Sequence, residues 1–164
     1  MKDLRIFVTG GTIDKIHDTR TEALGFSPDG ATHIPEMLRV GRCHFPVVEV
    51  LMLKDSLHFD ESDREAIAAA VMRATEEAIV ITHGTGTLAE TARHLEAAGT
   101  EGKTIVITGA MRPFSLFSSD GEFNLGGAVV AAQVLSPGVW GVMNGRVFPA
   151  ATLRKNVAQG RFDA

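Results

Sequence analysis

The stretch that decides the fold is AIVITHGTGTLAETARHLEAA, residues 78–98. Its first part, Ala78–Thr82, is a continuous apolar run rich in β-branched residues, which is typical of a strand covered on both faces. A turn of small residues follows. Thr87-Leu-Ala-Glu90 then has the spacing of a capping box, and apolar residues recur after it at helical intervals. The stretch therefore predicts a strand, a tight turn and a helix that begins near Thr87.

The same alternation of strand and helix patterns runs along the rest of the chain. Four further apolar runs predict strands: Leu4–Val8, Val47–Leu53, Thr104–Thr108 and Val139–Met143. Helical spacing follows Asp60, a candidate N-cap, and recurs around Leu125. Asn144-Gly145 predicts a hairpin turn near the C-terminus. This order favours right-handed crossovers and an α/β fold. We expect a doubly wound, three-layer α/β/α sandwich with a mainly parallel, flavodoxin-like sheet of four or five parallel strands.

Two polar segments show neither the strand pattern nor the helix pattern of apolar residues. They are Asp14–Thr32 and Arg112–Gly121. We expect both to be loops, the second held together by Arg112 and Asp120. A structureless segment as long as 14–32 is uncommon inside a compact domain and is often an active-site lid. We therefore interpret residues 14–32 as a mobile lid and residues 1–164 as a single catalytic domain.

Composition narrows the class of partner. The chain has 16 basic and 20 acidic residues and a net charge of −4, so it offers no positive field for nucleic acid. We expect a small-molecule ligand instead. The single cysteine, Cys43, cannot form an internal disulfide, and no spacing of Cys or His indicates a metal site. With no signal-type run at the start and no stretch of membrane-spanning length, a cytoplasmic location without membrane contact fits best.

Three of the expected strands end in similar turns: Thr9-Gly-Gly-Thr12, Thr82-His-Gly-Thr-Gly-Thr87 and Thr108-Gly-Ala-Met-Arg-Pro113. In open parallel sheets the ligand crevice lies beyond the carboxyl ends of the strands, so these turns should meet at one site. Thr12 and Thr85 lie beyond their strands and are free to face the crevice. The helix that begins near Thr87 would direct its positive end there, which favours an anionic small molecule. Nucleotide binding is disfavoured because neither glycine-rich phosphate motif is present.

Five motifs in a fixed order carry a more specific signal. They are Thr9-Gly-Gly-Thr-Ile13, Ile81-Thr-His-Gly-Thr85, Gly109-Ala-Met-Arg-Pro113, Ser119-Asp-Gly-x-x-Asn-Leu125 and Met143-Asn144. Over nearly the whole chain they resemble the bacterial L-asparaginase family. Members of that family have two domains and about twice this length, so the chain resembles a short form with the N-terminal catalytic domain only. The resemblance implies hydrolysis of asparagine, and less readily of glutamine, to the acid and ammonia without metal or cofactor.

The resemblance also implies roles for individual residues. Thr12 matches the nucleophile that forms the acyl-enzyme, and Thr85 with Lys155 matches the pair that activates the attacking group. A hydroxyl needs such a base, and a lysine can serve only when it is held neutral. Backbone N–H groups near Gly84 and Thr85 would stabilise the oxyanion. The sequence leaves open which threonine attacks first. His83 is expected to bond backbone behind the site.

The implied substrate contacts are less complete. Ser56 matches the serine that binds the substrate carboxylate, and Ala110 matches a backbone contact to the substrate amide. Leu57 stands where the family has glutamine or serine. Gly86 stands where the family has the aspartate that holds the substrate ammonium, so a charge-assisted contact of about 1.5–3 kcal/mol is missing.

Two other departures leave alternatives open. The chain has no tyrosine for the lid position, where His17 could relay a proton or could simply be a surface residue. The carboxylate that the family takes from a neighbour's second domain has no counterpart here. Besides a threonine-dependent L-asparaginase, two alternatives remain: an impaired relative that binds an amino acid or small acid, and an amidase whose substrate lacks the α-ammonium. Apolar surface left uncovered by the missing domain suggests a homodimer or higher homo-oligomer.

Overall fold

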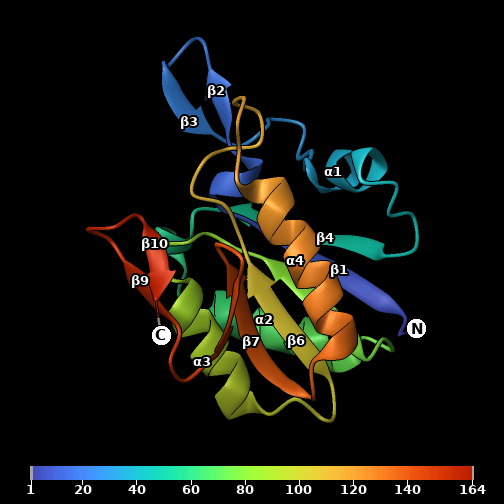
Figure 1. Ribbon diagram of the computed structural model, residues 1–164. Helices are drawn as coiled ribbons and strands as arrows, with labels where there is room; N and C mark the ends of the chain where they lie inside the picture. Colours follow the sequence, from blue (N-terminus) through green and yellow to red (C-terminus); the bar gives the residue numbers. More distant parts are fainter. Residues whose placement is uncertain (1, 164) are drawn as a thin grey trace.

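Five parallel strands form the centre of the structure, a computed structural model in which residues 2–163 are described (Figure 1). A sixth strand pairs antiparallel at one edge. In spatial order the strands are β4 (Val47–Lys54), β1 (Leu4–Gly10), β5 (Ala78–Thr82), β6 (Thr104–Thr108), β7 (Gly138–Met143) and β8 (Arg146–Pro149). The five parallel strands thus follow the flavodoxin order 2-1-3-4-5, which confirms the expected doubly wound α/β fold.

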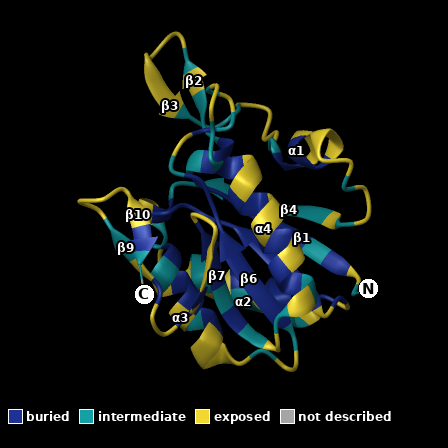
Figure 2. Ribbon diagram, in the orientation of Figure 1, coloured by how far each residue is buried: buried dark blue, intermediate teal, exposed yellow. Residues whose placement is uncertain are grey.

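Helices cover both faces of this sheet, and the buried residues divide accordingly. One face carries α2 (Glu61–Arg73) and α3 (Leu88–Ala98), and the other carries α1 (Ile34–Val40) and α4 (Gly121–Val134). Alternate side chains of β1 point to opposite faces of the sheet. Phe7 packs with α2 and α3, while Ile6 and Val8 pack with α1 and α4. The central strands are therefore buried on both sides (Figure 2). That double burial is why their sequences are apolar throughout.

Of the two helix N-terminal caps that the sequence predicted, the structure contains the one at α2 and not the one at α3. Asp60 caps α2 as predicted, because its carboxylate accepts from the Asp63 N–H at 3.1 Å while the Asp63 carboxylate accepts from the Asp60 N–H at 2.9 Å. The capping box predicted at Thr87 is wrong, although α3 does begin directly after it. The Thr87 hydroxyl donates instead to the Ser56 carbonyl at 2.8 Å, so a tertiary contact replaces the local cap.

The segment 14–32 is more structured than predicted. It contains two short antiparallel strands, β2 (Ile16–Asp18) and β3 (Ala23–Gly25), which form a hairpin that projects from the body (Figure 1). The helix α1 that follows also went unrecognised. Strands of three residues and a helix of seven are too short to show a period in sequence, and their formation depends on pairing and packing. The lid role of this segment stays a prediction.

The C-terminal region contains the expected hairpin and a second, smaller one. Strands β7 and β8 are joined at Asn144 and Gly145, whose φ angles of 55° and 73° suit the two-residue turn that the sequence predicted. Beyond it, β9 (Arg154–Asn156) and β10 (Arg161–Asp163) form a separate antiparallel pair. The serine-rich loop before α4 is irregular, as expected: the Asp120 carboxylate accepts from the Arg112 N–H at 3.0 Å.

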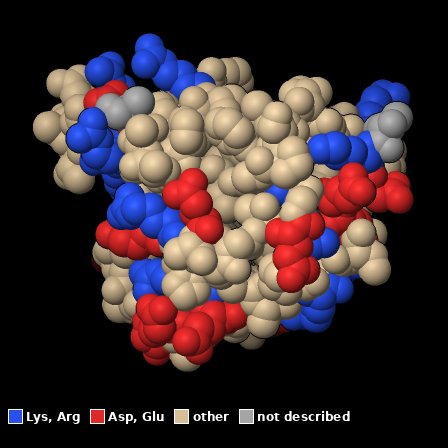
Figure 3. Space-filling model, turned by 90° about the horizontal axis from the view of Figure 1, so that it is seen from below, with Lys and Arg blue, Asp and Glu red and all other residues tan. Residues whose placement is uncertain are grey.

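Charged side chains of both signs lie close together on the end of the molecule seen from below (Figure 3). At the start of β1, Arg5 pairs with Glu76 at 2.8 Å and with Glu49 at 2.9 Å. The hydrogen bond from Arg5 lowers the pKa of Glu76. Within residues 2–163 no helix has the length and apolarity of a membrane span, and no cluster of three or more His, Cys, Asp or Glu side chains could hold a metal ion.

Candidate active site

A pocket of about 350 Å³ lies at the carboxyl ends of β1 and β5. The order β4-β1-β5 makes this the point where the direction of chain winding reverses, the usual ligand position in such sheets. The pocket is lined by Gly11, Thr12, Lys15, Asp55, Ser56, Leu57, Gly84, Thr85, Gly86, Lys155 and Val157. The structure thus brings together most of the residues that the sequence singled out, from four separate segments.

Close backbone contacts hold three of those segments in place. A Cβ atom on Gly11 would lie 2.3 Å from the Gly84 nitrogen, and one on Gly84 would lie 2.4 Å from the Ser56 Oγ. Gly11 also has φ +82°, a conformation that side chains disfavour. The turns after β1, β4 and β5 therefore touch directly. This contact places Thr12, Ser56 and Thr85 around one space.

Thr85 and Lys155 meet across 70 positions of sequence. The Lys155 Nζ donates to the Thr85 Oγ1 at 2.8 Å, and the Thr85 side chain is buried. Burial lowers the pKa of Lys155, so a larger fraction of its amine is neutral than in a free lysine. A neutral amine can take a proton from a hydroxyl. This contact has the geometry of a general base beside a candidate nucleophile.

Two asparagines support the hairpin that carries Lys155. The Asn144 Oδ1 accepts from the backbone N–H of Phe162, the residue opposite Lys155, at 2.9 Å. The Asn124 Oδ1 in turn accepts from the Asn144 N–H at 3.0 Å, and the Asn124 Nδ2 donates to the Gly109 carbonyl at 2.9 Å. The sequence motifs contain both asparagines, but the sequence predicted only a hairpin turn at Asn144 and no supporting role for either side chain. They connect the turn after β6 to the β9–β10 hairpin.

His83 lies behind the pocket and is fully buried. Its Nδ1 contacts the Gly84 carbonyl at 2.8 Å, and because a carbonyl only accepts, we assign the ring proton to Nδ1. The Nε2 then accepts from the Thr91 hydroxyl at 2.9 Å. Burial lowers the pKa of His83 to about 4. A neutral imidazole therefore fixes the turn that presents Thr85, as the sequence suggested.

The sequence did not predict the ion pair between Lys15 and Asp55, which lies in the wall of the pocket. The Lys15 Nζ donates to the Asp55 carboxylate at 2.5 Å, and the same carboxylate accepts from the Leu57 N–H at 3.0 Å. The bond from Lys15 lowers the pKa of Asp55. The only feature of the sequence that pointed to this pair was its place in the chain, since Lys15 follows the first family motif and Asp55 directly precedes Ser56.

Two predicted site residues lie elsewhere. His17 is exposed on β2 and lines a hollow of the β2–β3 hairpin, not the Thr12 pocket. The Ala110 side chain is fully buried in the core, and Ala110 is not among the residues that line the pocket. Contacts of His17 or Ala110 with a substrate therefore stay predictions.

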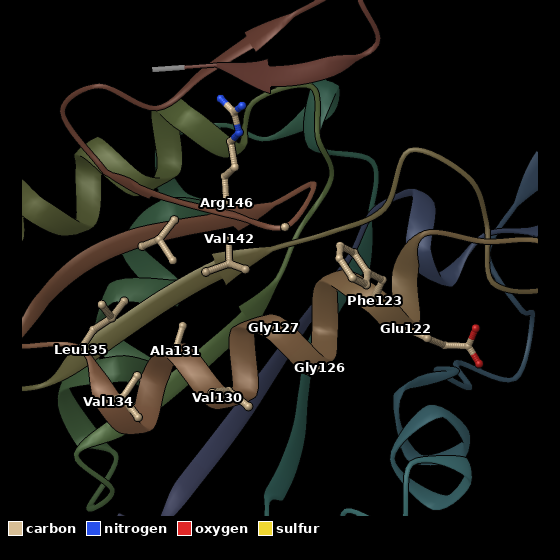
Figure 4. Close-up of a pocket in the computed structure, with 12 residues that line it drawn as sticks. Glu122, Phe123, Gly126, Gly127, Val130, Ala131, Val134, Leu135, Val142 and Arg146 are labelled. Atoms are coloured by element: carbon tan, nitrogen blue, oxygen red, sulfur yellow. The ribbon is translucent and has the colours of Figure 1, made fainter.

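A larger groove of about 640 Å³ runs along α4 (Figure 4). Its wall is mostly apolar, with Phe123, Val130 and Val134 from the helix and Val142 from β7. None of its lining residues is a Ser, Thr, Cys, His or Lys. The groove therefore offers neither a nucleophile nor a general base of the kind found in the Thr12 pocket.

Comparison with known proteins shows the family to which the chain belongs. The family model "Asparaginase, N-terminal" matches residues 3–164. The chain belongs to the asparaginase family. L-asparaginase 2 of Bacillus subtilis is 29% identical over 94% of this chain and 44% of its own length. The glutaminase-asparaginase of Acinetobacter glutaminasificans is 35% identical over 58% of the chain and 32% of its own length.

Solved asparaginase structures share the fold. The thermostable L-asparaginase from Thermococcus kodakarensis is 26% identical with a TM-score of 0.82, covering 98% of this chain and 50% of that one. The probable cytoplasmic L-asparaginase from Campylobacter jejuni is 26% identical with a TM-score of 0.81, covering 99% and 52%. The chain spans less than half the length of the curated relatives that it matches.

Proposed function

We propose that this asparaginase-family chain is an amidohydrolase that converts asparagine, and less readily glutamine, to the acid and ammonia through a threonine nucleophile. The observation that carries the proposal is the 2.8 Å contact between the Lys155 Nζ and the Thr85 Oγ1 in a pocket that also contains Thr12. A hydroxyl beside a base, with backbone N–H groups nearby, can supply the nucleophile, the proton acceptor and the oxyanion stabilisation of amide hydrolysis.

In the proposed reaction the Thr12 Oγ attacks the amide carbon while the Thr85–Lys155 pair accepts its proton. Backbone N–H groups near Gly84 and Thr85 stabilise the oxyanion. The C–N bond breaks, ammonia leaves with a proton returned by the pair, and an acyl-threonine ester remains. Water activated by the same pair then cleaves the ester. The alternative order, in which Thr85 forms the ester, uses the same base.

Ammonia release from asparagine and glutamine tests this proposal. Thr12→Ala should abolish turnover, and Thr12→Ser should retain part of it because the hydroxyl remains. Mass spectrometry after rapid quenching should detect an acyl adduct on Thr12. An adduct on Thr85 would transfer the nucleophile role to that residue. Full activity of Thr12→Ala with no adduct on either threonine would overturn the mechanism.

The base is tested through its pH dependence. The burial that lowers the pKa of Lys155 should make kcat/KM rise with pH in a range below the ordinary lysine titration. Lys155→Arg keeps the charge but cannot lose its proton, so it should lower kcat by about a hundredfold or more and remove that rise. Lys155→Met controls for loss of the charge. An unchanged pH profile in Lys155→Arg would exclude Lys155 as the base.

A second candidate function is binding of an amino acid or small acid without turnover. The observation that favours it is Gly86, which leaves the pocket without the carboxylate that holds the ammonium in the family pattern. Calorimetry distinguishes the two functions. Saturable binding of asparagine without any ammonia release would support the binding protein.

A further inference from the structure

Leu57 occupies the space that a side chain at position 86 would need. A Cβ atom on Gly86 would lie 2.6 Å from the Leu57 Cδ2 and 3.1 Å from its Cγ. The φ angle of Gly86 is not positive, so its backbone could accept another residue. A side chain at position 86 would therefore require the Leu57 side chain to move, while the backbone conformation would be no obstacle. The two residues form a pair that presents an apolar surface to the pocket.

Leu57 is 69% exposed, and the other large apolar side chain at the pocket, Val157, is 82% exposed. Exposure of both on one small rim means that each would gain by contact with an apolar portion of a ligand. Both lie in the same pocket as Thr12 and Thr85. A ligand that places its amide at the threonines thus meets apolar side chains along part of its length.

The pocket offers no free carboxylate to a cationic ligand. Its lining contains one carboxylate, Asp55, against two lysines, Lys15 and Lys155. Both oxygens of Asp55 are engaged, one by the Lys15 Nζ and the other by the Leu57 N–H. The positive N-terminal end of α3 begins at Leu88, two residues after Gly86. An ammonium group beside Gly86 would lie near the positive end of this helix and would find no free carboxylate in the lining.

We infer that the Leu57–Gly86 pair selects short aliphatic carboxamides that lack a charged amino group, neutral or with an anionic end, over α-amino acid amides. The inference rests on the proposed amide hydrolysis for its turnover readout, and on the pocket alone for its binding readout. The Ser56 hydroxyl can donate a hydrogen bond to an anionic end, while Leu57 offers an apolar contact and Gly86 offers no charge.

The test compares asparagine with succinamate, which is asparagine with hydrogen in place of its ammonium group. In the unaltered chain, kcat/KM for succinamate should exceed that for asparagine by about tenfold or more, because the ammonium of asparagine loses its hydration at the pocket and gains no partner. An equal or higher value for asparagine would overturn the inference. The comparison needs no variant, so it does not depend on whether a substituted chain folds.

Substitution of the pair then tests its role. Leu57→Ser combined with Gly86→Asp should shift the preference toward asparagine by about tenfold or more, because it opens the space and adds a carboxylate. Leu57→Ser combined with Gly86→Asn is the matched control, with the same size and no charge. An equal shift in both double variants, or none in either, would contradict a charge-based selection by this pair.

Calorimetry with the Thr12→Ala variant separates the inference from the proposed function. If the unaltered chain hydrolyses neither amide but the variant binds succinamate more tightly than asparagine, the hydrolase proposal fails and the inference holds. Equal binding of the two, tighter binding of asparagine, or binding of neither would overturn the inference.

Discussion

His83 supports the turn that presents Thr85 through two hydrogen bonds, one to the Gly84 carbonyl and one accepted from the Thr91 hydroxyl, and the second needs an unprotonated Nε2. Its burial is complete, and burial lowers its pKa from 6.5 to about 4, against the opposing effect of the Gly84 bond. The unfolded chain therefore binds a proton at this residue more readily than the folded chain. The contribution of His83 to stability is present above pH 6.5 and is lost as the pH falls toward 4.

This linkage gives a prediction for stability. A shift of that size corresponds to about 3 kcal/mol of unfolding free energy between pH 6.5 and 4. His83→Asn keeps a donor for Gly84 but does not titrate, so its stability should be lower at pH 7 and should fall less steeply on acidification. Urea unfolding at several pH values measures both slopes. Parallel curves for the two chains would show that His83 is not the group responsible.

The β9–β10 hairpin is the element on which the candidate base depends. It pairs only with itself, and the structure ties it to the body through the bond from the Phe162 N–H to the Asn144 Oδ1. Asn144 can serve because asparagine tolerates its φ of 55° better than most residues. The backbone of Asn144 thus forms part of the β7–β8 turn, while its side chain positions the strand opposite Lys155.

Asn144→Gly should therefore loosen the second hairpin without straining the first. Glycine tolerates the positive φ but offers no acceptor for Phe162, and the loss of one hydrogen bond costs about 1 kcal/mol. We expect faster amide exchange at Phe162 and a lower kcat, since Lys155 loses its fixed position. Asn144→Asp retains the acceptor and is the control. Equal exchange at Phe162 in both variants would refute this positioning role.

At the scale of the whole molecule, the site exists because loops from separate parts of the sheet touch. Gly11 meets the backbone of Gly84, which meets Ser56, so the pocket depends on contacts that no single element contains. Gly126 on the surface of α4 has no such function, since a Cβ atom there would meet nothing within 4 Å. The expected homo-oligomer stays a prediction, which light scattering would contradict by giving the mass of one chain.

Two glycine variants distinguish a glycine in close backbone contact, Gly11, from a glycine on the open surface of a helix, Gly126. Gly11→Ala should lower the unfolding free energy by about 3 kcal/mol, because the added Cβ meets backbone atoms at 2.3 Å and the residue has a positive φ. Gly126→Ala lies in open helix surface and should be neutral or stabilising by up to about 1 kcal/mol. Denaturant titration measures both. Similar effects of the two substitutions would argue against the tight contact at Gly11.

The sequence by itself determined the sheet and the helices that cover most of it. The side chains of an apolar run such as Ala78–Thr82 are removed from water only when both faces of the strand are covered. This pattern therefore predicts a sheet with helices on both sides. The Asp60 cap and the Asn144-Gly145 turn were also readable, because each depends on residues within four positions. The family motifs located Thr12 and Thr85 at strand ends for the same local reason.

Only the tertiary structure decided how those pieces meet. The contact of Thr87 with Ser56 in place of a local cap and the packing of Leu57 against Gly86 join residues distant in sequence. The pairing of Lys155 with Thr85 was implied by the family resemblance, but its 2.8 Å distance comes from the fold. The β2–β3 hairpin likewise depends on the pairing of its two strands and not on a repeating pattern of apolar residues. Such contacts depend on loop conformation and close packing, which a one-dimensional pattern does not encode.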